Sequence, residues 1–261
     1  MLKFHTACHA SRGARRYQED SAAMWPSSDP STGGGAPLIA VLADGMGGHA
    51  GGAIASRTAC DAFISAIRTG GDTNRERLRA ALDAANAAIA NHVANNPSLR
   101  GMGCTLVGAI FGENGLEWVS VGDSPLYLFR NGEIALLNED HSLAPALDQL
   151  AAEGRLTISQ ARSDPRRHLL RSAVTGEDLD LVDLSRQPLP LQPGDCVLLA
   201  SDGIQTLEPD QIARTIAKHL TAGPEAIAEA LISTVEDVGD PHQDNVTVLL
   251  VNPVEAREAV G

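Results

Sequence analysis

The chain has 261 residues and a formal net charge of −13, and 43% of its residues are hydrophobic although only 3% are aromatic. This length suits one large domain or two small ones, with a core filled by Ala, Val, Leu and Ile side chains. The negative charge argues against a general nucleic-acid binder, which needs a basic surface to release counterions, and against a protein that adheres to anionic membranes.

Two helices follow an early buried strand. The Ser-, Gly- and Pro-rich segment 26–37 fits a loop between strands better than a domain boundary, because the pieces beside it are too short to fold alone. Leu38–Ala43 is a continuous apolar run, which is typical of a buried strand. Apolar residues then recur with helical spacing from Ala53, and a second helix is predicted over 74–95 because Thr73 opens it with a capping box.

Hairpins and a second helix pair occupy the rest of the chain. The predicted strands cover residues 105–111, 116–121, 126–129, 134–137, 196–200 and 246–251. Asn131-Gly132 is the strongest short hairpin signal, and two consecutive helices are predicted over 209–220 and 224–238. Residues 145–175 are mixed and polar. Hairpins with paired helices indicate an antiparallel α+β domain rather than alternating βαβ units.

The cysteines and the N-terminus indicate a reduced, cytoplasmic protein. Cys8, Cys60, Cys104 and Cys196 are widely spaced without a CxxC pair, so neither a zinc site nor a disulfide framework is predicted. Residues 1–9 lack the apolar run of a signal peptide, and no stretch approaches the roughly 20 apolar residues of a membrane span. We therefore expect neither a membrane nor a nucleic acid as partner.

Aspartates recur beside the apolar strands. They are Asp20, Asp44, Asp123, Asp202 and Asp244. Strands of one core tend to finish on common edges, so these carboxylates could converge, although any one Asp-Gly pair is also typical of an ordinary turn. Two carboxylates about 4 Å apart repel by roughly 4 kcal/mol at an effective dielectric near 20, so such a cluster needs protons or cations. Oxygen ligands without His or Cys favour Mg²⁺ or Mn²⁺ over zinc.

A competing motif lies at the same place. Residues 45–50 match the G-x-G-x-x-G/A fingerprint of dinucleotide-binding proteins, between a strand and a helix. However, Asp44 would place an anion against the pyrophosphate, and Asp61, the acidic residue at about the right distance, lies inside a predicted helix. A dinucleotide-dependent oxidoreductase is therefore the less favoured alternative.

Basic side chains near the acidic motifs supply further candidates. Arg15 and Arg16 have the guanidinium group that binds phosphate in a bidentate manner, although a solvated pair in a loop fits the spacing equally well. His49, His141 and His242 lie close to the Gly-rich and acidic motifs and are candidate proton donors. Each of these histidines, taken alone, is more typical of a surface loop.

The ordered set of motifs resembles a bacterial member of the type 2C, metal-dependent serine/threonine protein phosphatase family. The matching segments are 13–20, 44–49, 101–105, 121–124, 140–142, 201–203 and 244–247, within a match over about 4–252. The resemblance implies a four-layer αββα sandwich of two stacked antiparallel sheets flanked by helix pairs, with metals in a cleft at one end. It implies one domain over 1–254 with a mobile flap at about 144–175, and a short tail over 255–261.

The resemblance also implies which residues hold two core Mg²⁺ or Mn²⁺ ions. Asp44 would bridge the two ions and act in catalysis, and the backbone carbonyl of Gly45 would bind the second. Asp202 and Asp244 would bind the first. The implied reaction is direct hydrolysis, in which a water shared by the two cations attacks phosphorus without a phosphoenzyme.

Four further residues receive roles by the same resemblance. Glu19 and Asp20 would act on the second ion, largely through its waters. Asp123, together with Asp202, would form a weaker third metal site. Arg15 would hold the substrate phosphate.

The chain departs from the family pattern without losing a metal carboxylate. Met46 stands where animal members have a histidine that acts as general acid, so the resemblance does not carry that role over to His49. Gln18, Cys104 and Pro125 replace other frequent residues. We expect an active, monomeric enzyme whose partners are phosphorylated proteins, among them a serine/threonine kinase and its targets. A regulatory binding module that has lost turnover is the second alternative.

Overall fold

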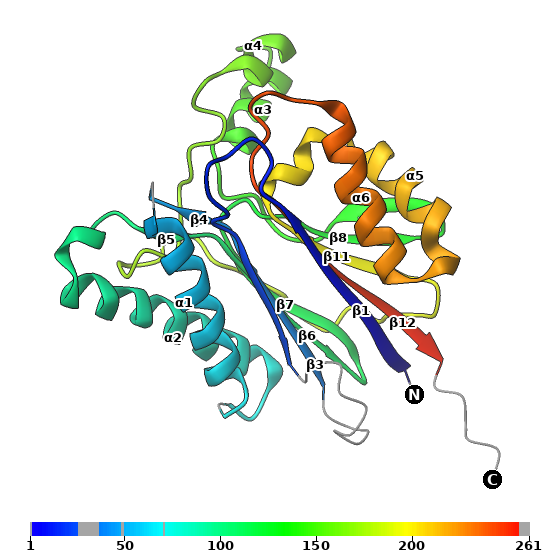
Figure 1. Ribbon diagram of the computed structural model, residues 1–261, viewed down its shortest axis with the longest axis horizontal. Helices are drawn as coiled ribbons and strands as arrows, with labels where there is room; N and C mark the ends of the chain where they lie inside the picture. The colour runs from blue at the N-terminus through cyan, green and yellow to red at the C-terminus, as the bar shows by residue number, and fades with distance from the viewer. Residues whose placement is uncertain (1, 26–36, 48–49, 70, 256–261) are drawn as a thin grey trace.

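The computed structural model describes residues 2–25, 37–47, 50–69 and 71–255, and Figure 1 shows their layered arrangement. Within that part of the chain, two five-stranded antiparallel sheets stack on each other. The first has the order β1 (Leu2–Ser11), β12 (Val246–Glu255), β11 (Cys196–Ala200), β8 (Leu126–Arg130) and β9 (Glu133–Leu136). The second has the order β10 (Asp183–Leu184), β7 (Gly115–Val121), β6 (Leu106–Gly112), β3 (Leu38–Ala43) and β2 (Ser21–Trp25).

A helix pair covers the outer face of each sheet (Figure 1). Helices α1 (Ala50–Ile67) and α2 (Asn74–Asn95) pack on the second sheet. Helices α5 (Pro209–His219) and α6 (Pro224–Val238) pack on the first. This is the predicted four-layer αββα sandwich.

Three apolar clusters hold the four layers together. One lies between α1, α2 and the second sheet and includes Phe63, Leu82 and Ile110. Another lies between the helices α5 and α6 and the first sheet. The third lies between the two sheets and includes Phe111 and Leu249. Because few aromatic residues are present, aliphatic side chains fill most of this interior, as the composition predicted.

Most predicted elements match the structure, and the mismatches have local causes. Helix α2 begins after Thr73, whose side chain accepts a hydrogen bond from the Glu76 backbone N–H, so the predicted capping box is formed. Helix α1 begins at Ala50, earlier than the predicted start at Ala53, because Gly51 and Gly52 in its first turn obscure the helical pattern. Strands β1 and β2 were not predicted, since their polar and small residues show no clear apolar run.

The mixed segment that follows β9 contains two short helices. They are α3 (Ala144–Ala152) and α4 (Ile158–Ser163), which lie beyond one end of the sandwich in Figure 1. Residues 26–36 of the predicted loop and 256–261 of the predicted tail lie outside the described residues. None of the helices that the structure describes combines the length and apolar character that a membrane crossing requires.

The antiparallel pairing brings the ends of separate strands to one edge. Ser21, which begins β2, pairs with Ala43, which ends β3. In the other sheet, Ala200 at the end of β11 pairs with Val248 near the start of β12. The residues just outside these strand ends therefore meet at the same end of the sandwich, and they are the aspartates.

Gly108 gives a test of how tightly α1 packs on the second sheet. A Cβ atom at Gly108 would lie 2.1 Å from Cζ of Phe63, whereas one at Gly112 on the same strand would meet no atom closer than 3.9 Å. We expect Gly108→Ala to lower the free energy of unfolding by about 1–3 kcal/mol through overpacking, and Gly112→Ala to change it by less than about 0.5 kcal/mol. Urea unfolding followed by tryptophan fluorescence measures both. Equal values for the two variants would contradict this account of the helix–sheet contact.

Candidate active site

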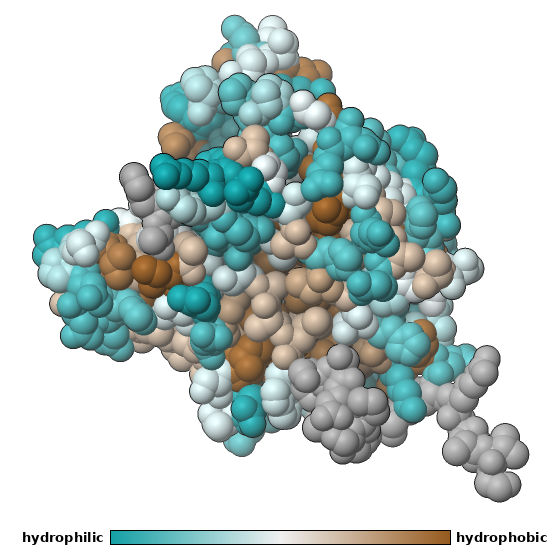
Figure 2. All heavy atoms as spheres, viewed as in Figure 1, coloured by the Kyte–Doolittle hydropathy of each residue, from teal (hydrophilic) through white to brown (hydrophobic). Residues whose placement is uncertain are grey.

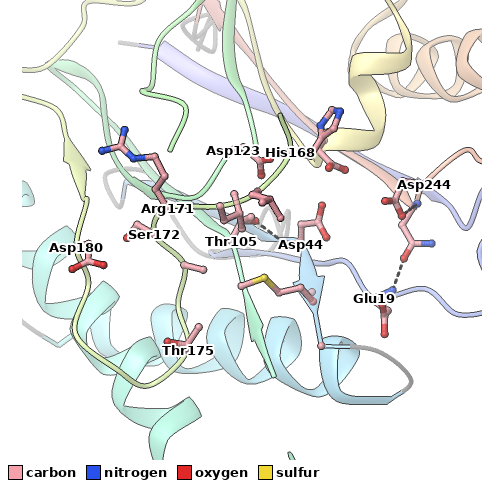
Figure 3. Close-up of a pocket in the computed structure, with 18 of the residues that line it drawn as sticks. Glu19, Asp44, Thr105, Asp123, His168, Arg171, Ser172, Thr175, Asp180 and Asp244 are labelled. Atoms are coloured by element: carbon pink, nitrogen blue, oxygen red, sulfur yellow. Dashed lines mark hydrogen bonds between the residues drawn. The ribbon is translucent and has the colours of Figure 1, made fainter. Parts of the chain in front are cut away.

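A cavity of about 630 Å³ opens at the end of the sandwich where the aspartates meet. Figure 3 shows Asp44, Asp123 and Asp244 around a common space, with Glu19 beneath Asp244. The predicted site residues that line the cavity are Arg15, Glu19, Asp44, Gly45, Asp123, Asp202 and Asp244. The opposite wall comes from residues 168–180, which follow α4. In Figure 2, strongly hydrophilic residues gather over the loop that follows β1, beside this end of the molecule.

The acidic groups in this cavity resist ionisation. Burial, followed by the charges of neighbouring aspartates, raises the pKa of Asp44 well above its usual value. Burial and the charge of Asp202 raise the pKa of Asp123 to about 7. The pKa of Asp202 is also raised, first by burial and then by Asp244. These shifts show that the carboxylates are close enough to repel one another in a poorly solvated space.

Asp20 lies behind the cavity wall, held by two hydroxyl groups. Its Oδ2 accepts hydrogen bonds of 2.7 Å from Ser201 Oγ and 2.7 Å from Thr247 Oγ1. Its Oδ1 is buried and finds no hydrogen-bond partner within the described ranges. Burial raises its pKa to about 6, and those two hydrogen bonds act in the opposite direction.

Two hydrogen bonds to Thr105 hold the backbone of Asp44 in place. Its backbone N–H donates to Thr105 Oγ1 at 3.0 Å, and its carbonyl accepts from the Thr105 N–H at 2.9 Å. The Thr105 hydroxyl also contacts Ser124 Oγ at 2.7 Å, next to Asp123. Buried hydroxyls thus connect the segments that carry two of the aspartates.

Gly45 lies where two backbone segments approach closely. A Cβ atom there would be 2.2 Å from the Gly52 carbonyl oxygen and 2.4 Å from that of Glu19. Gly45 and Met46 form strand β4, which pairs with β5 (Gly103–Cys104). The first glycine of the fingerprint, Gly45, thus lies in a short strand pairing before α1, instead of in a turn that leads directly into the helix, and this disfavours the dinucleotide alternative.

Asn245 clamps the loop that carries Arg15. Its Oδ1 accepts the Glu19 N–H at 2.8 Å, and its Nδ2 donates to the carbonyls of Arg12 at 2.8 Å and Tyr17 at 3.0 Å. The side chain of Asn245 is buried, and all three of these hydrogen bonds go to the backbone of the loop that carries Arg15. No sequence pattern pointed to this role.

The donor set suits a hard divalent cation. Asp202 Oδ1, like Asp20 Oδ1, is buried without a hydrogen-bond partner among the residues that the structure describes. Carboxylate oxygens are ligands that Mg²⁺ and Mn²⁺ prefer, and a bound cation would relieve the repulsion within this cluster. Over the described residues, however, no group of three or more His, Cys, Asp or Glu side chains is arranged to hold an ion as it stands.

His141 and His242, two of the histidine candidates, lie apart from this constellation. His141 is buried, and its Nδ1 accepts a hydrogen bond from the Gly122 N–H, so it supports the turn before Asp123. His242 does not line the cavity, and His49 is outside the described residues. His168, which the sequence did not single out, lines the cavity from the wall opposite the strands (Figure 3).

The comparison with known proteins agrees with this geometry. The family profile described as "Protein phosphatase 2C" matches residues 12–243. The chain belongs to the protein phosphatase 2C family. This confirms the resemblance found in the sequence motifs.

Bacterial members of the protein phosphatase 2C family are similar over most of the chain. Serine/threonine protein phosphatase PstP of Mycobacterium tuberculosis is 37% identical over 242 residues, which are 91% of this chain but 44% of that protein. The chain thus spans less than half of the length of that relative. Serine/threonine phosphatase Stp of Listeria monocytogenes is 32% identical over 254 residues, 95% of each chain.

A solved structure confirms the fold and shows metal in a relative. The catalytic domain of PstP in complex with two manganese ions is 32% identical, with a TM-score of 0.76 over 98% of this chain and all of that one. Two manganese ions in that relative agree with an oxygen-rich site in this one.

The raised carboxyl pKa values predict an unusual pH dependence for the protein in chelator. Asp123 has a folded-state pKa of about 7, above its ordinary value of 3.8. Its folded form therefore holds a proton more tightly, and this contribution to stability is complete below about pH 4 and is lost as the pH rises through about 7. We expect the melting temperature in EDTA to fall between about pH 4 and pH 7 and to level off above about pH 7.

Asp123→Asn should flatten this dependence, since an amide does not titrate. Asp83→Asn, on the exposed face of α2, serves as the control and should follow the wild type. If the melting temperatures of wild type and Asp123→Asn change with pH in parallel, the ionisation of Asp123 does not lower the stability, and the prediction is wrong. Differential scanning calorimetry at several pH values makes the measurement.

Proposed function

We propose that this protein hydrolyses phosphoserine and phosphothreonine in proteins, with two Mg²⁺ or Mn²⁺ ions in the cavity. The observation that carries the proposal is the convergence of aspartates from four separate strand ends on one cavity in a protein phosphatase 2C fold. Bound divalent cations would neutralise this cluster and supply an acidified water as the nucleophile.

The chain's own residues would hold these ions in defined roles. Asp44 would bridge them, and Asp202 and Asp244 would complete the first site. The carbonyl of Gly45, which lines the cavity, would bind the second ion. Asp123 with Asp202 would form a weaker third site.

Glu19 and Asp20 would complete the surroundings of the second ion. The two hydroxyl groups on Asp20 Oδ2 fix its carboxylate, so that Oδ1 keeps one direction. We assign Asp20 a role through bound water, since it does not line the cavity wall.

Arg15 would hold the substrate phosphate. It lines the cavity and lies on a loop whose backbone Asn245 fixes, and its side chain is 55% exposed. A guanidinium can bind two phosphate oxygens and orient the phosphorus toward a nucleophile deeper in the cavity.

The surroundings of the site suggest its partners. Residues 144–175 would act as a flap over the substrate, within a single domain over 1–254. The named relatives are serine/threonine phosphatases, so phosphoproteins are the expected substrates. The proposal extends to a monomeric, cytoplasmic enzyme that reverses the action of a serine/threonine kinase.

Asp202→Ala tests the metal assignment. Loss of a carboxylate shared by two proposed ion sites should lower Mn²⁺-dependent hydrolysis of an aryl phosphate and of a phosphothreonine peptide by at least about 100-fold. Asp83→Ala removes a surface carboxylate and should keep full activity. Full activity in Asp202→Ala would refute the assignment.

The same assays decide between the alternatives. Wild-type protein that binds Mn²⁺ but hydrolyses neither substrate would support the regulatory module instead. Binding of NAD without added metal, measured by calorimetry, would support the dinucleotide alternative.

A further inference from the structure

Arg15 and Asp244 form an ion pair at the mouth of the cavity. Arg15 Nη2 donates to Asp244 Oδ2, and the two side chains are 55% and 37% exposed. The partners are 229 residues apart in sequence. The residue proposed to bind phosphate is therefore in contact with a residue proposed to bind metal.

Asp244 differs from the deeper aspartates in that donors reach both of its oxygens. Oδ1 accepts the backbone N–H of Asn245 at 2.7 Å, and Oδ2 accepts Arg15. By contrast, Asp202 Oδ1 has no hydrogen-bond partner among the described residues. A cation that approaches Asp244 through Oδ2 must share that oxygen with the guanidinium or displace it.

The backbone around this pair is fixed, so the exchange needs only side-chain rotation. Ala14 N–H donates to the Gln243 carbonyl at 2.9 Å, which joins the Arg15 loop to the segment that carries Asp244. Gly13 lies against the same segment, where a Cβ atom would be 2.4 Å from the Asp244 carbonyl oxygen. Asn245 holds the rest of the loop, as described above.

We propose that Arg15 is a built-in counter-cation that competes with the divalent ion for Asp244. In the metal-free protein, its guanidinium relieves part of the repulsion among the aspartates. When a divalent ion takes Asp244, Arg15 is released and becomes available to phosphate. Since one guanidinium serves both acceptors, metal binds before phosphate, and the two bind cooperatively. This inference rests on the metal and phosphate roles proposed above.

The affinity for Mn²⁺ gives the first test. Removal of a side chain that helps to bind the ion would weaken Mn²⁺ binding, whereas removal of a competing cation should strengthen it. Calorimetric titration with Mn²⁺ should show that Arg15→Ala binds one ion about three- to five-fold more tightly than wild type, since the competing ion pair is gone. Arg16→Ala is the matched control. Arg16 carries the same charge one residue further on and stacks over the Tyr17 ring at 5.3 Å instead.

Arg16→Ala should change the Mn²⁺ affinity by less than about two-fold, because Arg16 stacks on Tyr17 instead of pairing with a cavity aspartate and its exposed charge is screened by salt. Equal gains in the two arginine variants would mean that only the general field matters, and this would overturn the proposal. Weaker Mn²⁺ binding by Arg15→Ala would overturn it as well.

Stability in chelator gives the second test. Arg15→Ala should lower the melting temperature in EDTA but not in saturating Mn²⁺. In an Asp244→Asn background, the EDTA effect of Arg15→Ala should disappear, because the acceptor charge is already gone. An undiminished effect in that background would show that Arg15 stabilises the protein elsewhere.

These readouts separate the inference from the proposed function. Normal turnover by wild type, with no gain in Mn²⁺ affinity for Arg15→Ala, defeats the inference alone. If Arg15→Ala binds Mn²⁺ more tightly but the wild-type protein hydrolyses no phosphoprotein, only the proposed function is defeated.

Discussion

Mutual repulsion among buried carboxylates is the constraint on which the rest of this structure depends. Asp44, Asp123 and Asp202 each have a raised pKa because they are buried and face one another. Such an arrangement opposes folding, so the apolar clusters on both sides of the two sheets must outweigh it. The fold thus holds together a set of charges that would separate in a flexible chain.

Hydroxyl and amide side chains, rather than cations of the protein, do most of the local positioning. Ser201 and Thr247 hold Asp20, and Thr105 holds the backbone of Asp44. Arg15 is the exception, since it contacts Asp244 directly. A neutral framework leaves the repulsion among the carboxylates largely uncompensated, and a divalent ion is strongly attracted to such a space.

Asp44, Asp123, Asp202 and Asp244 could be found from the sequence because each lies next to an apolar strand or a glycine. The strand ends give the positions, and the antiparallel order brings them together. Helix α2 was predictable for a similar local reason, since its capping box involves residues only three positions apart.

Contacts between distant segments could not be found in this way. The clamp by Asn245 joins residues more than 220 positions apart, and its three hydrogen bonds leave no local pattern. The place of His168 depends on how the segment after α4 folds back over the cavity. Strand β1 has alternating exposure without strong apolar character, so its pairing is evident only in three dimensions.

The pairing of β1 with β12 has a consequence for biosynthesis. Leu2 pairs with Glu255 and Ser11 with Val246, so β1 cannot find its neighbour in the sheet until β12 has been synthesised. Asp244 and Asn245 leave the ribosome just ahead of β12. A nascent chain therefore cannot complete its acidic pocket before β12 emerges, and a product truncated before Asp244 lacks both this strand pairing and the complete pocket.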